Sequence, residues 1–367
     1  MKILHIIEQL NIGGAEKDLI NKATYLSSYN VQNYIFCFYK KGYLANYIND
    51  KIKIISNNHN YKLYAIIKEA LHLNYIINQI KPDIIHTHLY SAELMLPIHK
   101  LLSNNPIPCI TSVQSLISQV KKGKKFIKIL FNFLIRKYYD KFIACSNAVK
   151  NELISYNFNQ NQIEIIYNAV NVNEYLQFQS NTSSNLLEYP IIGFIGRLEP
   201  YKGVPILIKA IPSIINKFKT LQLWIIGDGP EKNKLLKLSH KFNLTNYVKF
   251  LGTQLSIKEY LSKFSVLIVP SLSEPLGIVA LEGLAMKLPV IATNIDGLKE
   301  IIIDNQTGFL IQPNSIDSLT NKLIFVLNNY QLAKKIAEQG YEFIKQQFNI
   351  NILAEKQLML YKSLITK

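Results

Sequence analysis

Short apolar runs alternate with longer amphipathic segments along the whole chain. The runs are rich in Ile and Val, which predicts β-strands, and stretches of helical period such as 15–26 and 231–242 lie between them. Because strands that are apolar on both faces belong to parallel sheets covered by helices, the pattern predicts an α/β fold. The expected strands are 3–7, 34–38, 83–87, 142–144 and 163–166 in a first series, and 191–195, 221–226, 248–251, 266–269 and 290–292 in a second.

Two successive series of this kind predict two Rossmann-like domains, and 367 residues are enough for both. The best linker is the polar, Ser- and Asn-rich stretch 176–190, which ends in a proline before a strong strand. We therefore expect a first domain over 1–180 and a second over 187–349, followed by a final helix over 350–367.

The composition is that of a folded protein, with 49% hydrophobic and 18% charged residues. A net charge of +16 favours an anionic partner but does not choose among nucleic acid, an acidic membrane and a phosphate-bearing substrate. Nucleic acid is disfavoured, since no helix-turn-helix or aromatic-interleaved basic motif is present. Cys37, Cys109 and Cys145 have no pairing or metal-binding spacing, which predicts a reducing, cytoplasmic setting. The apolar run after Lys2 is short, which favours a first strand over a signal peptide.

Gly13 and Gly14 follow the first expected strand and precede a helical segment. Glycine lets the backbone approach a phosphate, and the N-terminus of a helix offers free N–H groups with a partial positive charge. A plain tight turn explains the same residues equally well. No G-x-G-x-x-G occurs here, which disfavours a dinucleotide site and hence a dehydrogenase.

Two cations follow the first strand of the second series, Arg197 and Lys202, and Pro205 marks the start of a helix. Arg can bind phosphate oxygens in a fork, while Lys acts as a point charge. The alternative is that both are solvated surface cations. Their setting between glycines disfavours this interpretation. The arrangement predicts a diphosphate site.

A third stretch places Glu274 in a loop and Glu282 within the apolar helix that follows it. Carboxylates accept hydrogen bonds from sugar hydroxyls, and Gly277 leaves backbone N–H groups open to phosphate. Glu282 stands among Val, Ala, Leu and Gly residues, where a charge is rare without a partner. We therefore expect Glu282 to have one.

A fourth stretch ends in His86 and His88, which share one face of a strand. We expect one of them to project at the carboxyl end of the strand, where parallel sheets bind ligands. A packed core histidine is the plainer alternative. Such a pair could begin a zinc site, but no third ligand is close in the sequence, and we expect no metal.

Together these stretches resemble the family 4 retaining glycosyltransferases, also described as glycosyl transferases group 1. The segment SEPLGIVALEG, from Ser273 to Gly283, looks like the E-x7-E signature of that family, and GRLEPYKG, LWIIGDGPEKNKL, VKFLG and TGFLI occur in the family's order. In the first half GGAE, DIIHTH, DKFIACS and IIYNAVN match more loosely. The resemblance covers nearly the whole chain. It implies the GT-B fold, in which two Rossmann-like domains with parallel sheets face a central cleft and the C-terminal helix crosses back onto the first domain.

The resemblance also implies residue roles. Arg197 and Lys202 would neutralise the donor diphosphate. Glu274 would bond the donor sugar, Glu282 the ribose, and His88 would lie beside the transferred sugar. The implied catalytic residues are His88, Arg197, Lys202 and Glu274. The implied donor-binding residues are Gly13, Gly14, Arg197, Lys202, Glu274, Gly277, Ile278, Val279 and Glu282.

The function implied is a retaining hexosyltransferase that uses no metal and no cofactor. It would move a hexose or N-acetylhexosamine from a nucleotide diphosphate sugar, UDP favoured over GDP, to a cell-surface glycan or lipid-linked acceptor such as lipopolysaccharide or capsule. The alternatives are a nucleotide-sugar epimerase of similar architecture and a non-catalytic nucleotide-sugar-binding subunit. Gln114 stands where the family commonly has His, and Asn168-Ala169-Val170-Asn171 replaces the usual Asn-Gly-Val-Asp. Both departures bear on the acceptor.

The segment 121–141 is strongly basic, with Asp140 as its one acid, and its apolar residues follow a helical period. A basic amphipathic helix is typical of membrane surfaces, so this segment is a candidate contact with the anionic inner face of the cytoplasmic membrane. An ordinary helix packed on the first sheet, with a solvated basic edge, explains the same pattern.

Overall fold

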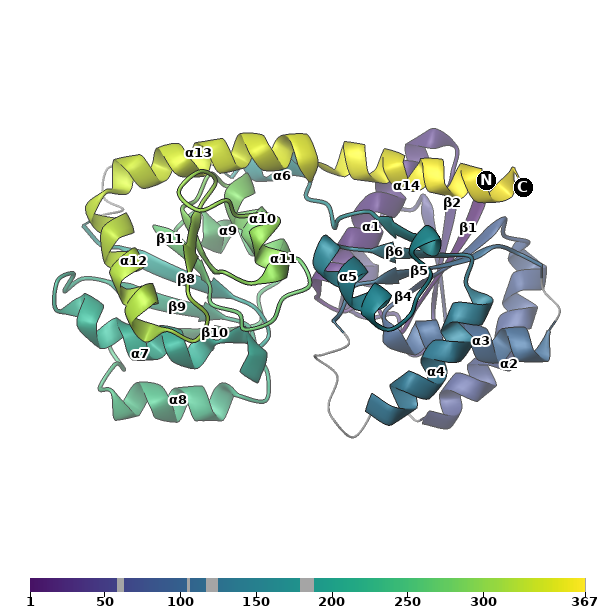
Figure 1. Ribbon diagram of the computed structural model, residues 1–367, viewed down its shortest axis with the longest axis horizontal. Helices are drawn as coiled ribbons and strands as arrows, with labels where there is room; N and C mark the ends of the chain where they lie inside the picture. The colour runs from purple at the N-terminus through teal and green to yellow at the C-terminus, as the bar shows by residue number, and fades with distance from the viewer. Residues whose placement is uncertain (58–62, 104–105, 117–124, 179–187, 367) are drawn as a thin grey trace. The chain divides into compact units, whose positions relative to one another are not determined.

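The computed structural model describes residues 1–57, 63–103, 106–116, 125–178 and 188–366. The chain divides into two compact units. The first comprises Met1–Ala169 with Ile350–Lys367, and the second comprises Val170–Asn349 (Figure 1).

The described residues of the first unit form a seven-stranded parallel sheet in the order β3-β2-β1-β4-β5-β6-β7. Its strands are apolar on both faces because helices cover both, and the parallel pairing follows from the helical crossovers. They are β1 (Lys2–Ile7), β2 (Gln32–Cys37), β3 (Ile52–Ser56), β4 (Ile84–His88), β5 (Cys109–Val113), β6 (Lys141–Ala144) and β7 (Ile163–Ile165).

Different helices cover the two faces of this sheet (Figure 1). On one face α1 (Gly14–Leu26) packs against α14 (Ile350–Ile365), which returns from the end of the chain to the core of β1, β4 and β5. On the other face Thr87 bonds the hydroxyl of Tyr139, which donates to the carbonyl of Glu93 in α3. The remaining helices are α2 (Leu63–Ile80), α3 (Tyr90–Leu102), α4 (Lys125–Tyr138) and α5 (Asn147–Ser155).

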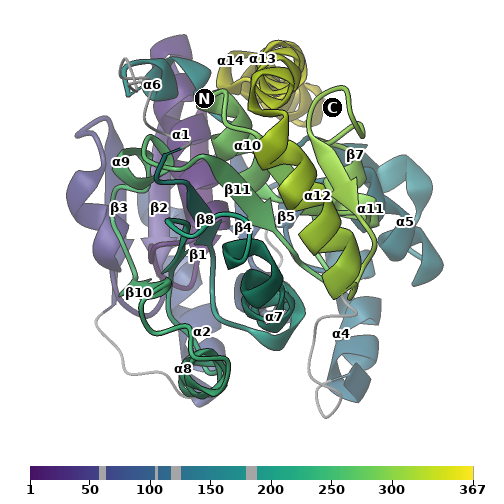
Figure 2. The same cartoon turned by 90° about the vertical axis from the view of Figure 1, so that its left-hand side faces the viewer.

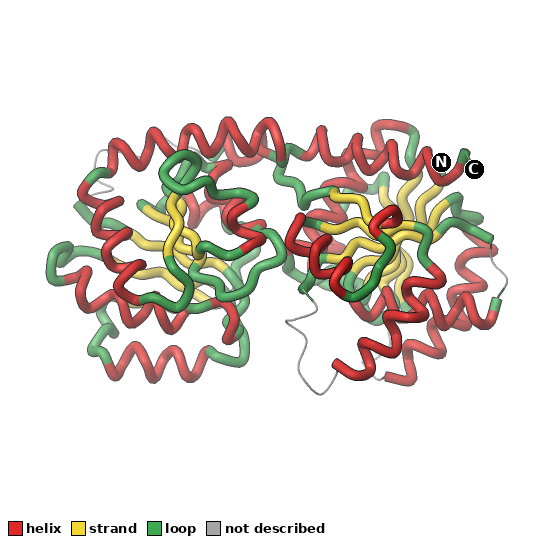
Figure 3. Tube along the Cα trace, viewed as in Figure 1, coloured by secondary structure: helices red, strands yellow, loops and turns green. Residues whose placement is uncertain are grey.

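The described residues of the second unit form a six-stranded parallel sheet in the order β10-β9-β8-β11-β12-β13, with its strands at the centre and helices around them (Figure 3). These strands are β8 (Ile191–Ile195), β9 (Gln222–Ile226), β10 (Val248–Gly252), β11 (Val266–Val269), β12 (Val290–Thr293) and β13 (Phe309–Ile311).

In this unit α7 packs against α12 over the main apolar core, and α10 packs against α13 (Figure 2). Ser315 caps α12 with its hydroxyl, which accepts a hydrogen bond from the N–H of Ser318. The helices are α6 (Val172–Leu176), α7 (Val204–Ile215), α8 (Lys232–Lys241), α9 (Lys258–Leu261), α10 (Ile278–Ala285), α11 (Asp296–Lys299), α12 (Ile316–Asn328) and α13 (Tyr330–Gln347).

The two parallel-sheet units confirm the predicted fold class. The first unit ends at Ala169, whereas the sequence placed the end of the first domain at 180. The reason is α6, which is tied to the second unit by the Tyr175–Glu282 hydrogen bond and by the ion pair between Glu174 and Lys258.

Three strands were not among those expected from the sequence, namely β3, β5 and β13. β3 and β13 are edge strands, and β3 exposes Lys53, which breaks its apolar run. β5 is central, but Thr111 and Ser112 interrupt its apolar pattern. Both are buried, and their hydroxyls bond to groups of β4.

The basic segment 121–141 is only partly covered, since 117–124 lie outside the described residues together with the side chains of Lys125 and Lys128. In the described part of α4, Ile135 is buried and Arg136 donates to the carbonyl of Asn157. Membrane contact by this segment therefore stays a prediction. No described helix has both the length and the apolarity needed to cross a membrane.

Candidate active site

The second sheet reverses its strand order between β8 and β11. From β8 the chain adds β9 and β10 on one side, and from β11 it adds β12 and β13 on the other. Ligands of open α/β sheets bind at such a switch point, outside the carboxyl ends of the strands. Two of the sequence-predicted stretches occupy this place, since residues 196–203 follow β8 and residues 270–277 follow β11.

The centre of the site is an ion pair between these two loops. The Nζ atom of Lys202 lies 2.6 Å from Oε2 of Glu274, and both side chains are mostly buried. The structure thus brings together two residues that are far apart in the sequence and that were assigned to phosphate and sugar respectively. A cation and a hydrogen-bond-accepting carboxylate side by side suit a ligand that carries both phosphate and hydroxyl groups.

Two glycines with left-handed backbone lie in these loops. Gly203 has a φ of 69°, and a Cβ at this position would collide with the carbonyl oxygen of Pro270 in the other loop. Gly277 has a φ of 106° and precedes α10, where a side chain would strike Leu298. Both conformations are in the left-handed region that L side chains avoid. A larger residue at Gly203 would therefore push the two loops apart, and one at Gly277 would collide with Leu298.

The start of α10 faces this switch point with its own backbone donors. The first helical bond inside α10 is donated by the N–H of Ala280 to the carbonyl of Gly277. The N–H groups of Ile278 and Val279 precede it and belong to the helix end that carries partial positive charge. Phosphate binding by these two N–H groups stays a prediction.

Arg197 follows β8 but does not join the ion pair. Its side chain is largely exposed and lies 3.0 Å from a carboxylate oxygen of Glu199. A surface ion pair of this kind contributes little stability, so the guanidinium can leave it for a ligand at small cost.

Glu282 has the partner that its apolar setting required. Its residue is 4% exposed, and its Oε1 atom accepts a hydrogen bond of 3.0 Å from the hydroxyl of Tyr175, which is 6% exposed. Burial, and next the charge of Glu282, raise the pKa of Tyr175 well above its usual value, so the hydroxyl keeps its proton and donates. The sequence reasoning predicted that a partner exists but missed Tyr175, which lies in α6, 107 residues before Glu282 in the chain.

In the first unit Gly13 and Gly14 lie at the carboxyl end of β1, where α1 begins. A Cβ on Gly13 would collide with the carboxylate of Glu16, which folds back over the first turn. An acid at this place suits the positive end of the helix. Donor binding by Gly13 and Gly14 stays a prediction.

His88 ends β4, as predicted, but it is 2% exposed and lies inside the first unit. Its Nε2 atom is 3.1 Å from Nδ1 of His5 on the neighbouring strand β1. Contact with a transferred sugar therefore stays a prediction. The next residue, Leu89, has a φ of 67°, a strained conformation for a bulky side chain and one that clusters at functional sites.

Burial keeps the three histidines of this cluster neutral. It lowers the pKa of His5 to about 4, against the hydrogen bond to Asn33, which raises it. Burial is also the main cause that lowers the pKa of His86 and His88. Because the amide N of Asn33 donates to a carbonyl, we assign its Oδ1 as the acceptor for Nε2–H of His5, which leaves Nδ1 of His5 to accept from His88.

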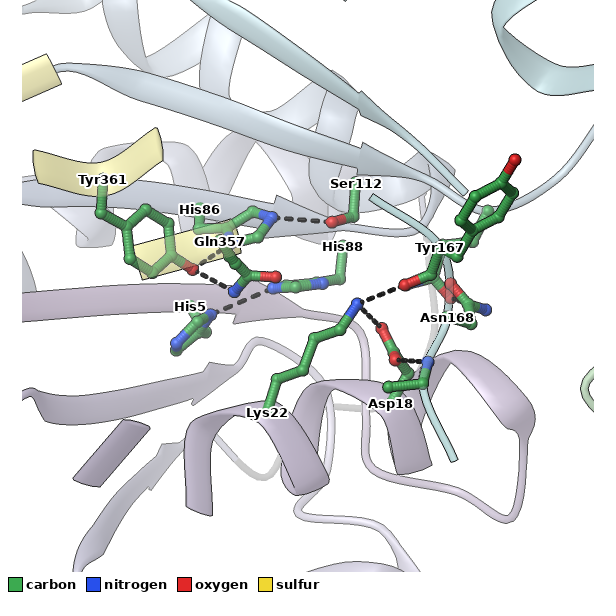
Figure 4. A network of polar contacts seen from close by, with 12 residues as sticks. His5, Asp18, Lys22, His86, His88, Ser112, Tyr167, Asn168, Gln357 and Tyr361 are labelled. Carbon is green, nitrogen blue, oxygen red and sulfur yellow. Dashed lines mark hydrogen bonds and ion pairs between the residues drawn. The ribbon is translucent and has the colours of Figure 1, made fainter. Parts of the chain in front are cut away.

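His86 connects this cluster to the C-terminal helix (Figure 4). Its Nδ1 atom lies 2.7 Å from the hydroxyl of Tyr361, which accepts from the amide of Gln357, and its Nε2 atom lies 2.8 Å from the hydroxyl of Ser112. This chain of bonds fixes α14 on β4 and β5. His86 therefore has a structural role that explains it without a ligand.

A buried ion pair on α1 fixes the end of the first unit (Figure 4). Lys22 lies 2.9 Å from Asp18 and also donates to the carbonyl of Tyr167, while Asp18 accepts from the N–H of Ala169. Residues 167–169, where the chain leaves this unit, are thereby held to α1.

Of the described residues, His5, His86 and His88 form a group of three metal-ligand side chains whose ligand atoms lie within 4.8 Å of one another. The sequence reasoning found no third ligand, because it missed His5, which strand pairing places beside His86. Both nitrogens of His86 have hydrogen-bond partners, and the charge of Lys22 lowers the pKa of His86 and His88 further. Burial is the larger cause of these shifts, and Lys22 is itself paired with Asp18, so the absence of a metal from this cluster stays a prediction.

The family follows from comparison with known proteins. The model of "Glycosyltransferase Family 4" matches residues 12–174, and that of "Glycosyl transferases group 1" matches residues 177–343. This protein belongs to the family 4 glycosyltransferases. An uncharacterized glycosyltransferase of Methanocaldococcus jannaschii is 34% identical over 72% of this chain and 71% of its own length.

Other relatives of this glycosyltransferase include the capsular polysaccharide biosynthesis glycosyltransferase CapM of Staphylococcus aureus, 23% identical over 88% of this chain and 87% of its own. Among solved structures, Anabaena HepE in complex with UDP-glucose has a TM-score of 0.83 at 20% identity, covering 99% of this chain and 100% of that one. Sucrose-phosphate synthase of Thermosynechococcus elongatus has a TM-score of 0.85 at 20% identity, with coverage of 100% and 99%. These likenesses establish the GT-B fold.

Proposed function

We propose that this glycosyltransferase moves a hexose or N-acetylhexosamine from a UDP-sugar to a cell-surface glycan or lipid-linked acceptor, with retention of configuration and without a metal ion. The observation that carries the proposal is the Lys202–Glu274 pair at the switch point of the second sheet. The donor has a diphosphate for the ammonium group and sugar hydroxyls for the carboxylate, so one ligand satisfies both.

In the proposed reaction the bond between the sugar carbon and the phosphate oxygen breaks, and its electron pair stays on the diphosphate. Lys202, Arg197 and the first N–H groups of α10 would stabilise that growing charge, which is the largest contribution a preorganised site can make. Glu274 would hold the sugar, and Glu282 the ribose. The acceptor oxygen would bond to the same face of the sugar and transfer its proton to the departing phosphate.

The donor and acceptor classes are supported by relatives. HepE of Anabaena was solved with UDP and with UDP-glucose. Relatives carry names in capsular polysaccharide biosynthesis, lipopolysaccharide core biosynthesis and poly(ribitol-phosphate) glycosylation. A net charge of +16 suits both a nucleotide donor and a phosphate-bearing acceptor.

The test is a thermal-shift screen of the purified chain against UDP, GDP and ADP sugars, followed by product analysis. A ligand at 100 times its Kd raises the unfolding free energy by about 2.7 kcal/mol, so the preferred donor should stand out. NMR of the product would then show whether the anomeric configuration of the donor is kept. Conversion of the donor into its epimer without transfer would instead support the epimerase alternative.

A further inference from the structure

An exposed pair of tyrosines lies in the loop after β2. Tyr43 and Tyr47 are the ends of a short 3-10 helix, and they are 40% and 66% exposed. Their rings are stacked with centroids 5.4 Å apart, and their hydroxyls are 2.7 Å apart. Two large aromatic side chains thus form one ordered, outward-facing surface.

This aromatic pair is held firmly to the loop that follows β1. The N–H of Leu10 donates to the carbonyl of Lys41, and the N–H of Leu44 donates to the carbonyl of Leu10. Gly42 has a φ of 78°, and a Cβ there would collide with the backbone of Leu10. The loop that carries the pair is therefore bonded to Leu10, which lies three residues before Gly13 in the sequence. Both loops leave the carboxyl ends of their strands, β1 and β2.

A second tyrosine pair in the chain shows what a structural role looks like. Tyr25 and Tyr29 have the same spacing and a similar ring separation, but both hydroxyls bond the carboxylate of Glu355 in α14. They join two helices of the first unit. The hydrogen bond between Tyr43 and Tyr47, by contrast, joins these two side chains to each other.

Two lysines precede the aromatic pair in the same loop. Lys40 and Lys41 are both exposed and lie in the same loop, directly before Gly42. The loop leaves the carboxyl end of β2, beside β1, at the edge of a parallel sheet where ligands bind. A loop that carries both an exposed aromatic pair and two exposed lysines suits a sugar that carries phosphate.

We propose that Tyr43 and Tyr47 form a subsite that stacks a sugar ring of the acceptor, with Lys40 and Lys41 binding a phosphate group on it. This inference rests on the proposed transferase function and names the acceptor chemistry. Aromatic faces carry partial negative charge, which attracts the C–H groups of a sugar ring, and the apolar face of that ring is removed from water. The lysine ammonium group is a point charge on a flexible side chain, so it can bind a phosphate group in more than one orientation.

The test is saturation-transfer NMR on the full chain with UDP present. The probes are the methyl glycosides of glucose, galactose and N-acetylglucosamine and the corresponding sugar 1-phosphates. At least one sugar 1-phosphate should bind, and Tyr47→Ala should raise the Kd of that probe about tenfold. Tyr47→Phe keeps the ring and should retain most of the affinity. Lys40→Gln with Lys41→Gln should remove the preference for the phosphorylated probe.

Tyr29→Ala is the matched control, because it removes an exposed tyrosine of the other pair and should leave probe binding unchanged. Thermal unfolding and binding of UDP-glucose should be unaltered in Tyr47→Ala. Binding of no probe, or equal binding by wild type and Tyr47→Ala, would overturn the subsite while leaving the proposed function standing if UDP-glucose still binds. Failure of every UDP-sugar to bind the wild type would instead overturn the function. A shift from dimer to monomer in Tyr47→Ala would identify the pair as a contact between copies and also overturn the subsite.

Discussion

Replacing Tyr175 with Phe removes one hydroxyl from the interior of the second unit. The lost group donates at 3.0 Å to the carboxylate of Glu282, and both residues are almost fully buried. A hydrogen bond to a charged group contributes about 1.5–3 kcal/mol, and Phe keeps the packing of the ring. Glu282 retains further interactions, which favours the lower end of that range. We expect the free energy of unfolding of the second unit to fall by about 1.5–2 kcal/mol.

The chain offers a local reporter for this measurement. Trp224 on β9 is its one tryptophan, so fluorescence during urea unfolding follows the second unit. Tyr189→Phe is the control, because that side chain lies in the same unit and is largely exposed. It should change the unfolding free energy by no more than about 0.5 kcal/mol.

A double-mutant cycle with Glu282→Gln isolates the hydrogen bond from other effects of the substitution. With a neutral acceptor the same hydroxyl contributes only about 0.5–1.5 kcal/mol, so Tyr175→Phe should cost less in the Glu282→Gln background. An unfolding free energy of Tyr175→Phe equal to that of Tyr189→Phe would contradict this contribution of the hydrogen bond. An equal cost of Tyr175→Phe with Glu and with Gln at position 282 would contradict it as well.

Three further predictions concern the site and the histidine cluster. Arg197→Ala and Lys202→Ala should each lower the turnover of UDP-sugar by about 10²–10³-fold, and near-wild-type turnover in both would remove the diphosphate assignment. Thermal unfolding should be unchanged in Arg197→Ala, whose side chain is largely exposed, and should occur at a lower temperature in Lys202→Ala, which leaves Glu274 without its ion-pair partner. Transfer activity should persist after dialysis against EDTA, since positive side chains and a helix end stabilise the leaving group; loss on chelation with rescue by Mg²⁺ or Mn²⁺ contradicts this. Because the pKa of His5 in the folded protein is about 4 against 6.5 in the unfolded chain, the unfolded state takes up the proton first. Stability should therefore fall as the pH drops from about 6.5 towards 4, by up to roughly 3 kcal/mol from His5 alone, and a flat profile in urea titrations followed by circular dichroism would show that His5 is not buried and neutral.

Much of the fold could be predicted from local pattern. Apolar runs and helical periods gave most strands of both sheets, because burial on two faces leaves a direct mark on the sequence. The pattern did not reveal β3 and β13, which are edge strands, or β5, whose buried hydroxyls look like surface residues until their partners in β4 are known. It also placed α6 with the wrong unit, since nothing local to 170–176 shows that Tyr175 bonds Glu282.

The candidate site divides in the same way. The sequence by itself determined which residue types follow each strand, and therefore that Arg197, Lys202 and Glu274 lie at strand ends. Only the tertiary structure decided that Lys202 meets Glu274, because that depends on β8 and β11 being neighbours at the point where the strand order reverses. It likewise placed His5 against His88, which is 83 residues away along the chain. Periodicity records whether a residue is buried, but it carries no information on which distant strand lies beside it, since that is set by the crossovers and by the packing of the whole unit.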